Sequence, residues 1–142
     1  MAVYSLSQRT SATAAASAAW EIRTAAGDRA VLLELGISQV TAVAGVYGLG
    51  RPAAIGVTPT SPQTFLAEDF ADPASTVQAS VAWATGPTVP ANFFRRVACP
   101  ATIGAGVIWT FPRGLVVPIS SSIIIWILAT APVCDVWAVI DQ

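Results

Sequence analysis

Residues 20–38 of this chain, WEIRTAAGDRAVLLELGIS, contain two strand-like runs separated by a turn. In the first run, residues 20–23, apolar and charged residues alternate, which is the period of a strand with one buried face. Gly27 and Asp28 then offer turn chemistry, and residues 30–38 form a second apolar run. The stretch therefore predicts a β-hairpin.

Sequence of the same kind recurs along the chain. Val, Ile and Thr supply forty residues, clustered in short runs that Gly and Pro interrupt, which is typical of strands. About eight strands with regular turn signals predict an all-β fold, a jelly-roll-like sandwich of two antiparallel sheets. The other expected strand segments are residues 3–8, 40–47, 76–85, 92–99, 106–111, 115–117, 122–129 and 134–140.

Glycine and proline mark the expected breaks between these strands. Gly48 and Gly50 precede Pro52 and are expected to end regular pairing, and the Pro-Arg-Gly sequence of residues 112–114 is expected to form a turn. The longest irregular stretch follows Pro52 and extends to residue 75. Long loops of this kind usually carry function or lie across a surface.

The length of 142 residues fits one domain. Residues 10–19 are rich in Ala, Ser and Thr without an amphipathic period, so an extended connector, a short helix and a flexible arm all remain open. We expect an extended N-terminal arm over residues 1–19, able to add a strand to a neighbour, and a single β-sandwich domain over residues 20–142.

The chain is unusually apolar and poor in charge. Hydrophobic residues make up 54% and charged residues 11% of it, against about 45–50% and about 25% in typical soluble domains. A membrane-spanning helix needs about 20 apolar residues, and the strongest run, residues 123–128, extends only to residue 131 before a proline. The first residues also lack a secretion signal. Contact with other protein, as a homo-oligomer or on a partner, is therefore expected to cover the excess apolar surface.

The absence of histidine and lysine from the sequence limits its chemistry. No catalytic triad, imidazole metal site, Schiff base or P-loop lysine is possible. We expect no enzyme activity and no cofactor. A glycosidase that uses only carboxylates stays open as an alternative, and its eligible residues are Glu21, Glu34, Glu68, Asp69, Asp72, Asp135 and Asp141.

Two smaller groups of residues leave alternatives open. Glu68, Asp69 and Asp72 could offer oxygen ligands to calcium, but the loop lacks the pattern of an EF-hand, and a solvated or arginine-facing loop is the favoured interpretation. Cys99 and Cys134 are the only cysteines. They could form a disulfide, but two buried free thiols are favoured.

The seven arginines and eight carboxylates are scattered along the sequence, without a basic stripe of the kind that binds nucleic acid. Nucleic acid is therefore not an expected partner. Arg95 and Arg96 follow two phenylalanines on an expected strand, where alternation would turn one arginine inward, toward a carboxylate, unless both lie in water.

A set of segments, none of them a diagnostic catalytic motif, extends over most of the chain from Trp20 onward. These segments are GLGRPAAIG at residues 48–56, WAT at residues 83–85, FRR at residues 94–96, WTFPRGL at residues 109–115, Trp126 and DVWAVID at residues 135–141. Together they resemble small proteins encoded among the virion genes of tailed phages, and these proteins resemble capsid decoration (cement) proteins.

The resemblance implies a β-sandwich subunit, commonly trimeric, that lies on the outer capsid surface of the virion and clamps neighbouring major capsid subunits. A carbohydrate- or host-binding module of a phage head or tail fibre is the alternative. The expected interface residues are Tyr4, Leu6, Arg51, Phe93, Arg95, Arg96 and Arg113.

Overall fold

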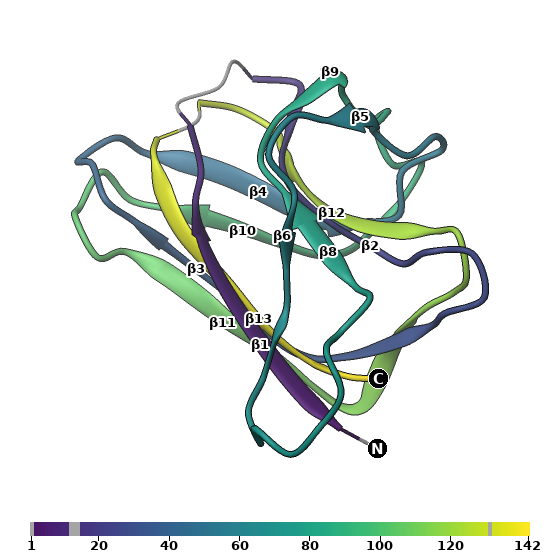
Figure 1. Cartoon of the computed structure of the whole chain (residues 1–142). Helices are drawn as coiled ribbons and strands as arrows, with labels where there is room; N and C mark the ends of the chain where they lie inside the picture. The colour runs from purple at the N-terminus through teal and green to yellow at the C-terminus, as the bar shows by residue number, and fades with distance from the viewer. Residues whose placement is uncertain (1, 12–14, 131) are drawn as a thin grey trace.

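The regular elements of the computed structural model, which describes residues 2–11, 15–130 and 132–142, are all β-strands (Figure 1). Within these residues there is no helix long and apolar enough to cross a membrane. In chain order the strands are β1 (Val3–Arg9), β2 (Ser17–Arg23), β3 (Ala30–Gln39), β4 (Gly45–Gly50), β5 (Val57–Pro59), β6 (Gln63–Thr64), β7 (Leu66–Ala67), β8 (Gln78–Ser80), β9 (Trp83–Thr85), β10 (Phe93–Cys99), β11 (Gly106–Val117), β12 (Ser122–Ile127) and β13 (Cys134–Asp141).

Two antiparallel sheets form a sandwich. The five-stranded sheet has the order β11-β3-β13-β1-β7, and the six-stranded sheet has the order β10-β4-β12-β2-β8-β6. Eight strands have six or more residues, and in chain order they are β1, β2, β3, β4, β10, β11, β12 and β13. When these eight are counted from one to eight, strands 1, 8, 3 and 6 share one sheet, and strands 2, 7, 4 and 5 share the other. This strand order is that of a jelly roll. The predicted fold class is confirmed.

The main core lies between the sheets because alternate residues of the central strands point inward. Burial alternates along β13 from Cys134 to Ile140. β12 differs, because all of its residues are buried and its outer face carries Ile124 and Trp126, which pack with Ala18 in a second apolar cluster. Each fully buried large aliphatic side chain contributes about 1.5–3 kcal/mol, so the six-stranded sheet is anchored on both faces.

The hairpin expected in residues 20–38 is wrong, although both of its strands exist. β2 pairs with β12 and β8, whereas β3 pairs with β11 and β13 in the other sheet. The chain turns at Gly27, where φ is 95°, and crosses from one sheet to the other. Hydrophobic alternation identifies the buried face of a strand, but two strands of a sandwich share one core without pairing with each other.

The expected N-terminal arm is also wrong for its described residues. β1 pairs with β13 along its whole length, from Val3↔Asp141 to Arg9↔Asp135, and also with β7. Tyr4 and Leu6 are 2% and 8% exposed and belong to the core. These two residues therefore cannot form the expected interface. Part of the connector expected over residues 10–19 lies outside the described residues, and β2 already begins at Ser17.

Two expected breaks are parts of strands. β4 starts later than expected but continues through Gly48 to Gly50, because Phe93 occupies the space of a side chain at Gly48: an added Cβ would lie 2.5 Å from the ring. β11 runs on past the proline, and its register with β3 shifts between Thr110 and Leu115. Residues 112–114 are therefore part of a bulge that protrudes from one strand, not a turn between two.

The long insertion between β4 and β10 closes one side of the sandwich. Its segment from β6 to β7 passes from the edge of the six-stranded sheet to the edge of the five-stranded sheet, and Phe65 between them is only 2% exposed. The strand expected over residues 76–85 is split, since β8 joins the six-stranded sheet and β9 pairs with β5. On the opposite side, β10 and β11 remain as long edge strands.

The cysteines are two buried free thiols, as favoured from the sequence. Burial raises the pKa of both thiols, and the Tyr47 hydroxyl lies 3.0 Å from Cys134 Sγ. A raised pKa lowers the thiolate fraction, so both groups are chemically quiet.

Candidate functional site

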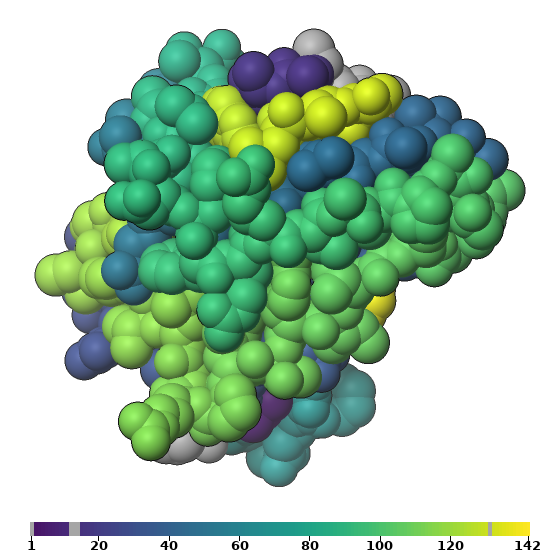
Figure 2. All heavy atoms as spheres, turned by 180° about the vertical axis from the view of Figure 1, so that it is seen from behind, coloured from purple at the N-terminus to yellow at the C-terminus, as the bar shows by residue number. Residues whose placement is uncertain are grey.

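Four of the seven arginines gather on the side of the sandwich where β10 and β11 are edges. Seen from behind in Figure 2, this side is covered largely by the green segments of the chain that include these two strands. We call the surface the arginine edge. It consists of Arg51, Phe93, Phe94, Arg95, Arg96, Phe111 and Arg113.

Phenylalanine rings hold three of these guanidinium groups. Arg51 lies 5.3 Å from the centroid of Phe94, and Arg96 lies 5.7 Å from that of Phe93. Arg95 of β10 reaches the other sheet and lies 5.8 Å from the centroid of Phe111 on β11. Exposed cation–π contacts of this kind contribute about 0.5–1 kcal/mol each. The rings thus restrict the arginines and preorganise their N–H donors.

Hydrogen bonds to the backbone fix two of the same arginines. Arg51, just after β4, donates from Nη2 to the carbonyl oxygen of Val116 on β11 at 2.7 Å. Arg95 Nη1 donates to the carbonyl oxygen of Phe94 at 2.8 Å. Arg51 and Arg95 therefore both link the two sheets at the open side of the sandwich.

No carboxylate neutralises this edge among the residues that the structure describes, where the ion pairs are Arg9 with Asp135 and Arg23 with Glu21. The fold thus brings together arginines that are scattered in the sequence. Uncompensated positive charge on a rigid surface attracts anionic groups and steers their approach. The arginine edge is therefore the candidate functional site.

The bulge of β11 adds a hollow to the arginine edge. It has a volume of about 350 Å³ and is lined by Arg95, Phe111, Pro112, Arg113 and Gly114. Gly114 has a φ of 68°, a left-handed conformation that favours glycine and allows the bulge. The hollow combines an aromatic wall with two cations, so it suits an apolar group that stands beside a carboxylate.

Five of the seven expected interface residues meet at this edge: Arg51, Phe93, Arg95, Arg96 and Arg113. Of the two alternatives left open for Arg95 and Arg96, neither side chain turns inward and both are exposed. The register of β10 shifts between Phe93 and Arg95, which breaks strict alternation. Sequence reasoning missed Phe94 and Phe111 as ring partners, because Phe111 belongs to the other sheet.

The carboxylates of residues 68–72 do not converge as ligands. Asp69 Oδ1 accepts a hydrogen bond from the Ala71 backbone N–H at 2.9 Å, and Asp72 N donates to the Asp69 carbonyl at 3.0 Å. No cluster suited to a metal ion occurs in the described part of the chain. These residues form a tight exposed turn in which Phe70 is fully exposed.

Three of the remaining carboxylates proposed for glycoside hydrolysis have structural partners. Glu21 accepts from Trp83 Nε1 at 2.7 Å, and Glu34 accepts from Trp137 Nε1 at 3.1 Å. Asp135 accepts from Arg9 at 2.7 and 2.9 Å, and this hydrogen bonding lowers the pKa of its carboxyl. Asp141 is buried at the end of β13. These carboxylates thus lie at separate positions, and among the described residues no two of them are found in a shared cleft.

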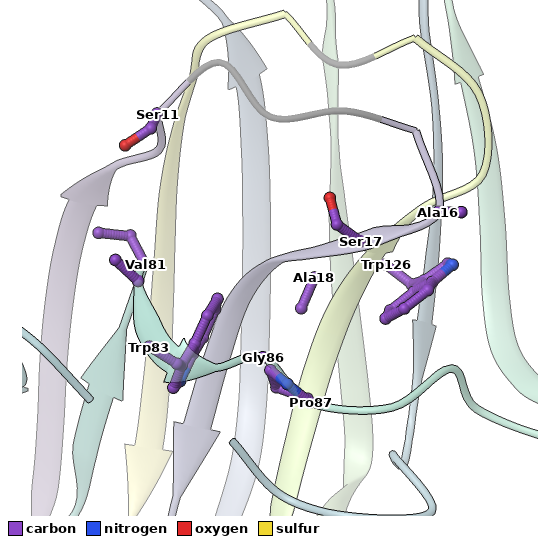
Figure 3. Close-up of a pocket in the computed structure, with 10 residues that line it drawn as sticks. Ser11, Ala16, Ser17, Ala18, Val81, Trp83, Gly86, Pro87 and Trp126 are labelled. Carbon is purple, nitrogen blue, oxygen red and sulfur yellow. The ribbon is translucent and has the colours of Figure 1, made fainter. Parts of the chain in front are cut away.

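A second hollow of about 530 Å³ lies over the outer face of the six-stranded sheet (Figure 3). Trp83 of β9 and Trp126 of β12 line it together with Ala18 of β2. Glu21 holds Trp83 through the indole N–H, and Trp126 is only 7% exposed. Two tryptophan rings therefore form walls of this hollow, although the ring of Trp126 is largely covered.

Comparison with known proteins gives no match of significance, whether to a protein family, to a curated protein sequence or to a solved structure.

Proposed function

We propose that the protein is a non-enzymatic structural subunit of a virion, a capsid decoration protein that forms a homo-oligomer, most simply a trimer, on the outer capsid surface. In this role it clamps neighbouring major capsid subunits and stabilises the head. It needs neither a cofactor nor nucleic acid as a partner.

The observation that carries this proposal is the arginine edge. Its guanidinium groups are held by rings and backbone carbonyls and face outward without carboxylate partners among the described residues. Arg and Phe are residues that protein interfaces favour. Charges and a bulge on edge strands discourage strand-to-strand pairing, so this surface is suited to docking through side chains rather than by strand addition.

The jelly roll suits a clamp because its two sheets are tied together at the arginine edge and share a continuous core. A rigid subunit loses little entropy when it binds. An oligomer presents several copies of each contact, so modest individual affinities add up to firm attachment through high effective concentration. The resemblance noted in the sequence implies the same role.

Electron microscopy of intact particles from the source tests the proposal. The expected result is density for this subunit on the outside of the head, over the junctions between major capsid subunits. Heads stripped of the protein should rebind it and become more resistant to heating. Density confined to the tail, or heads that neither bind nor respond, would refute the proposal.

The hollow between Trp83 and Trp126 favours one second candidate, a carbohydrate- or host-binding module of a head or tail fibre. Sugars stack on aromatic faces, and the polar side chains of Ser11 and Ser17 also line this hollow. A glycan array with the purified protein tests this candidate. Binding that Trp83→Ala abolishes and Trp137→Ala, on the other sheet, retains would support it, and an array without any bound glycan would contradict it.

A further inference from the structure

We infer that the arginine edge binds the acidic loop of a second copy of this chain. The acidic loop is the turn of residues 68–72, EDFAD, which contains Glu68, Asp69 and Asp72 around the exposed Phe70. The inference rests on the homo-oligomer of the proposed function and identifies the surfaces through which the copies meet.

The two surfaces carry opposite charge at opposite ends of one sheet. The acidic loop directly follows β7, and the Glu68 backbone N–H donates to the Val3 carbonyl at 2.9 Å. In the five-stranded sheet β7 is one edge and β11 is the other. Figure 1 looks onto the side of β1, β6 and β8, and Figure 2 looks onto the opposite side. The loop therefore cannot reach the arginine edge of its own chain.

Neither surface is neutralised within the chain. Neither of the ion pairs found in residues 2–11, 15–130 and 132–142 uses an arginine of the edge or a carboxylate of the loop. The hydrogen bond from Ala71 holds Asp69 in the turn, so Glu68 and Asp72 are the carboxylates free to bind outward. The four arginines of the edge thus face Glu68 and Asp72 of the loop when one copy meets the next.

The apolar parts of the two surfaces also match. Phe70 is 102% exposed at the tip of the loop, and Leu66 beside it is 68% exposed. The hollow of about 350 Å³ on the arginine edge has room for one aromatic side chain, and Arg95 and Arg113 flank it. An aromatic ring between two carboxylates thus meets an aromatic-lined hollow between two cations. Aromatic anchors in pockets are typical of the energetic centre of an interface.

Because the two surfaces differ, the contact is head to tail. Each copy uses its arginine edge toward one neighbour and its acidic loop toward the other, and such contacts generate a closed ring when the rotation between copies closes. Stacking of nucleic-acid bases is disfavoured, since guanidinium groups already cover Phe93, Phe94 and Phe111.

Reciprocal charge reversal tests this contact in purified protein. Glu68→Arg with Asp72→Arg makes both surfaces basic, and Arg95→Glu with Arg113→Glu makes both acidic; Asp69 is kept because it holds the turn. Each double variant alone should associate at least ~100-fold more weakly than the wild type, because like charges then face each other. The quadruple variant, which carries all four substitutions in one chain, exchanges the charges of the two surfaces and should regain assembly, measured by size-exclusion chromatography with light scattering.

Matched single variants control for charge itself. Arg9→Glu and Asp135→Arg change an exposed ion pair between two inner strands, at the end of β1 opposite to the acidic loop. They should assemble like the wild type, whereas Arg113→Glu and Glu68→Arg should not. Circular dichroism and thermal melting confirm that each variant is folded.

The inference is overturned if folded double variants assemble normally, if the folded quadruple variant stays monomeric, or if a short single-stranded oligonucleotide competes for the arginine edge at physiological salt. These measurements use no capsid. If the protein binds heads but does not self-assemble, only this inference is refuted. If it self-assembles but does not bind heads, only the proposed decoration role is refuted.

Discussion

At the residue scale, Glu21 shows most clearly how the fold compensates the cost of burying a charged side chain. This carboxylate is completely buried on the outer face of the six-stranded sheet. It accepts hydrogen bonds from Trp83 Nε1 at 2.7 Å and from Gly56 N at 3.1 Å, and Arg23 lies 4.0 Å away. A buried charge must be paired and hydrogen-bonded. Glu21 thereby pins the β5 and β9 pair onto the sheet.

Trp83→Phe should lower the free energy of unfolding by about 1.5–3 kcal/mol, because it removes a donor to a buried charge while it keeps most of the apolar contact. Trp137→Phe is the matched control, since its indole donates to Glu34, which is only partly buried. Urea unfolding of both variants gives the comparison. Equal losses in the two proteins would argue against the role of Glu21.

The raised thiol pKa values of Cys99 and Cys134 also lead to a testable result. Burial disfavours the thiolate, and only the thiolate reacts with disulfide reagents. Ellman's reagent at pH 8 should therefore react slowly with the native protein and rapidly with two thiols per chain in denaturant. Immediate reaction of the native protein would contradict the burial of both side chains.

At the element scale, the existence of most strands could be predicted from sequence, whereas their partners and ends could not. Period-two alternation identifies β13 and both strands of the quoted stretch, but it does not distinguish a hairpin from a crossing between sheets. Gly48 and Pro112 look like strand breakers in sequence. The first makes room for Phe93, and the second lies in a bulge on an edge strand, so neither ends its strand.

Substitutions in β1 test whether the first strand is an integral part of the sandwich, as its pairing with β13 indicates. Leu6→Ala should destabilise the protein by about 2–5 kcal/mol, because it opens a cavity in the core. Its neighbour Ser7 is exposed, and Ser7→Ala should change stability by less than about 0.5 kcal/mol. Denaturant unfolding measures both. A free arm would instead leave the two variants equally stable.

At the scale of the whole molecule, composition leads to the expectation of partners but does not locate the surfaces that would bind them. The arginines of the edge come from residue 51, from β10 and from β11, and only the sheet topology brings them together. The acidic loop was visible in sequence as a charged cluster, yet its position at the opposite edge follows from the pairing of β7 with β1. The proposed function depends on the arrangement of the sheet edges, which no local sequence pattern encodes.

Sedimentation equilibrium of the wild-type protein, over a range of concentrations at 50 and 500 mM salt, tests the central claim that copies meet through opposite charges on opposite edges. We predict a defined oligomer, of three subunits in the simplest case, at low salt and a marked shift toward monomer at high salt, because exposed ion pairs are screened. A monomer at every concentration and both salt levels would contradict the claim.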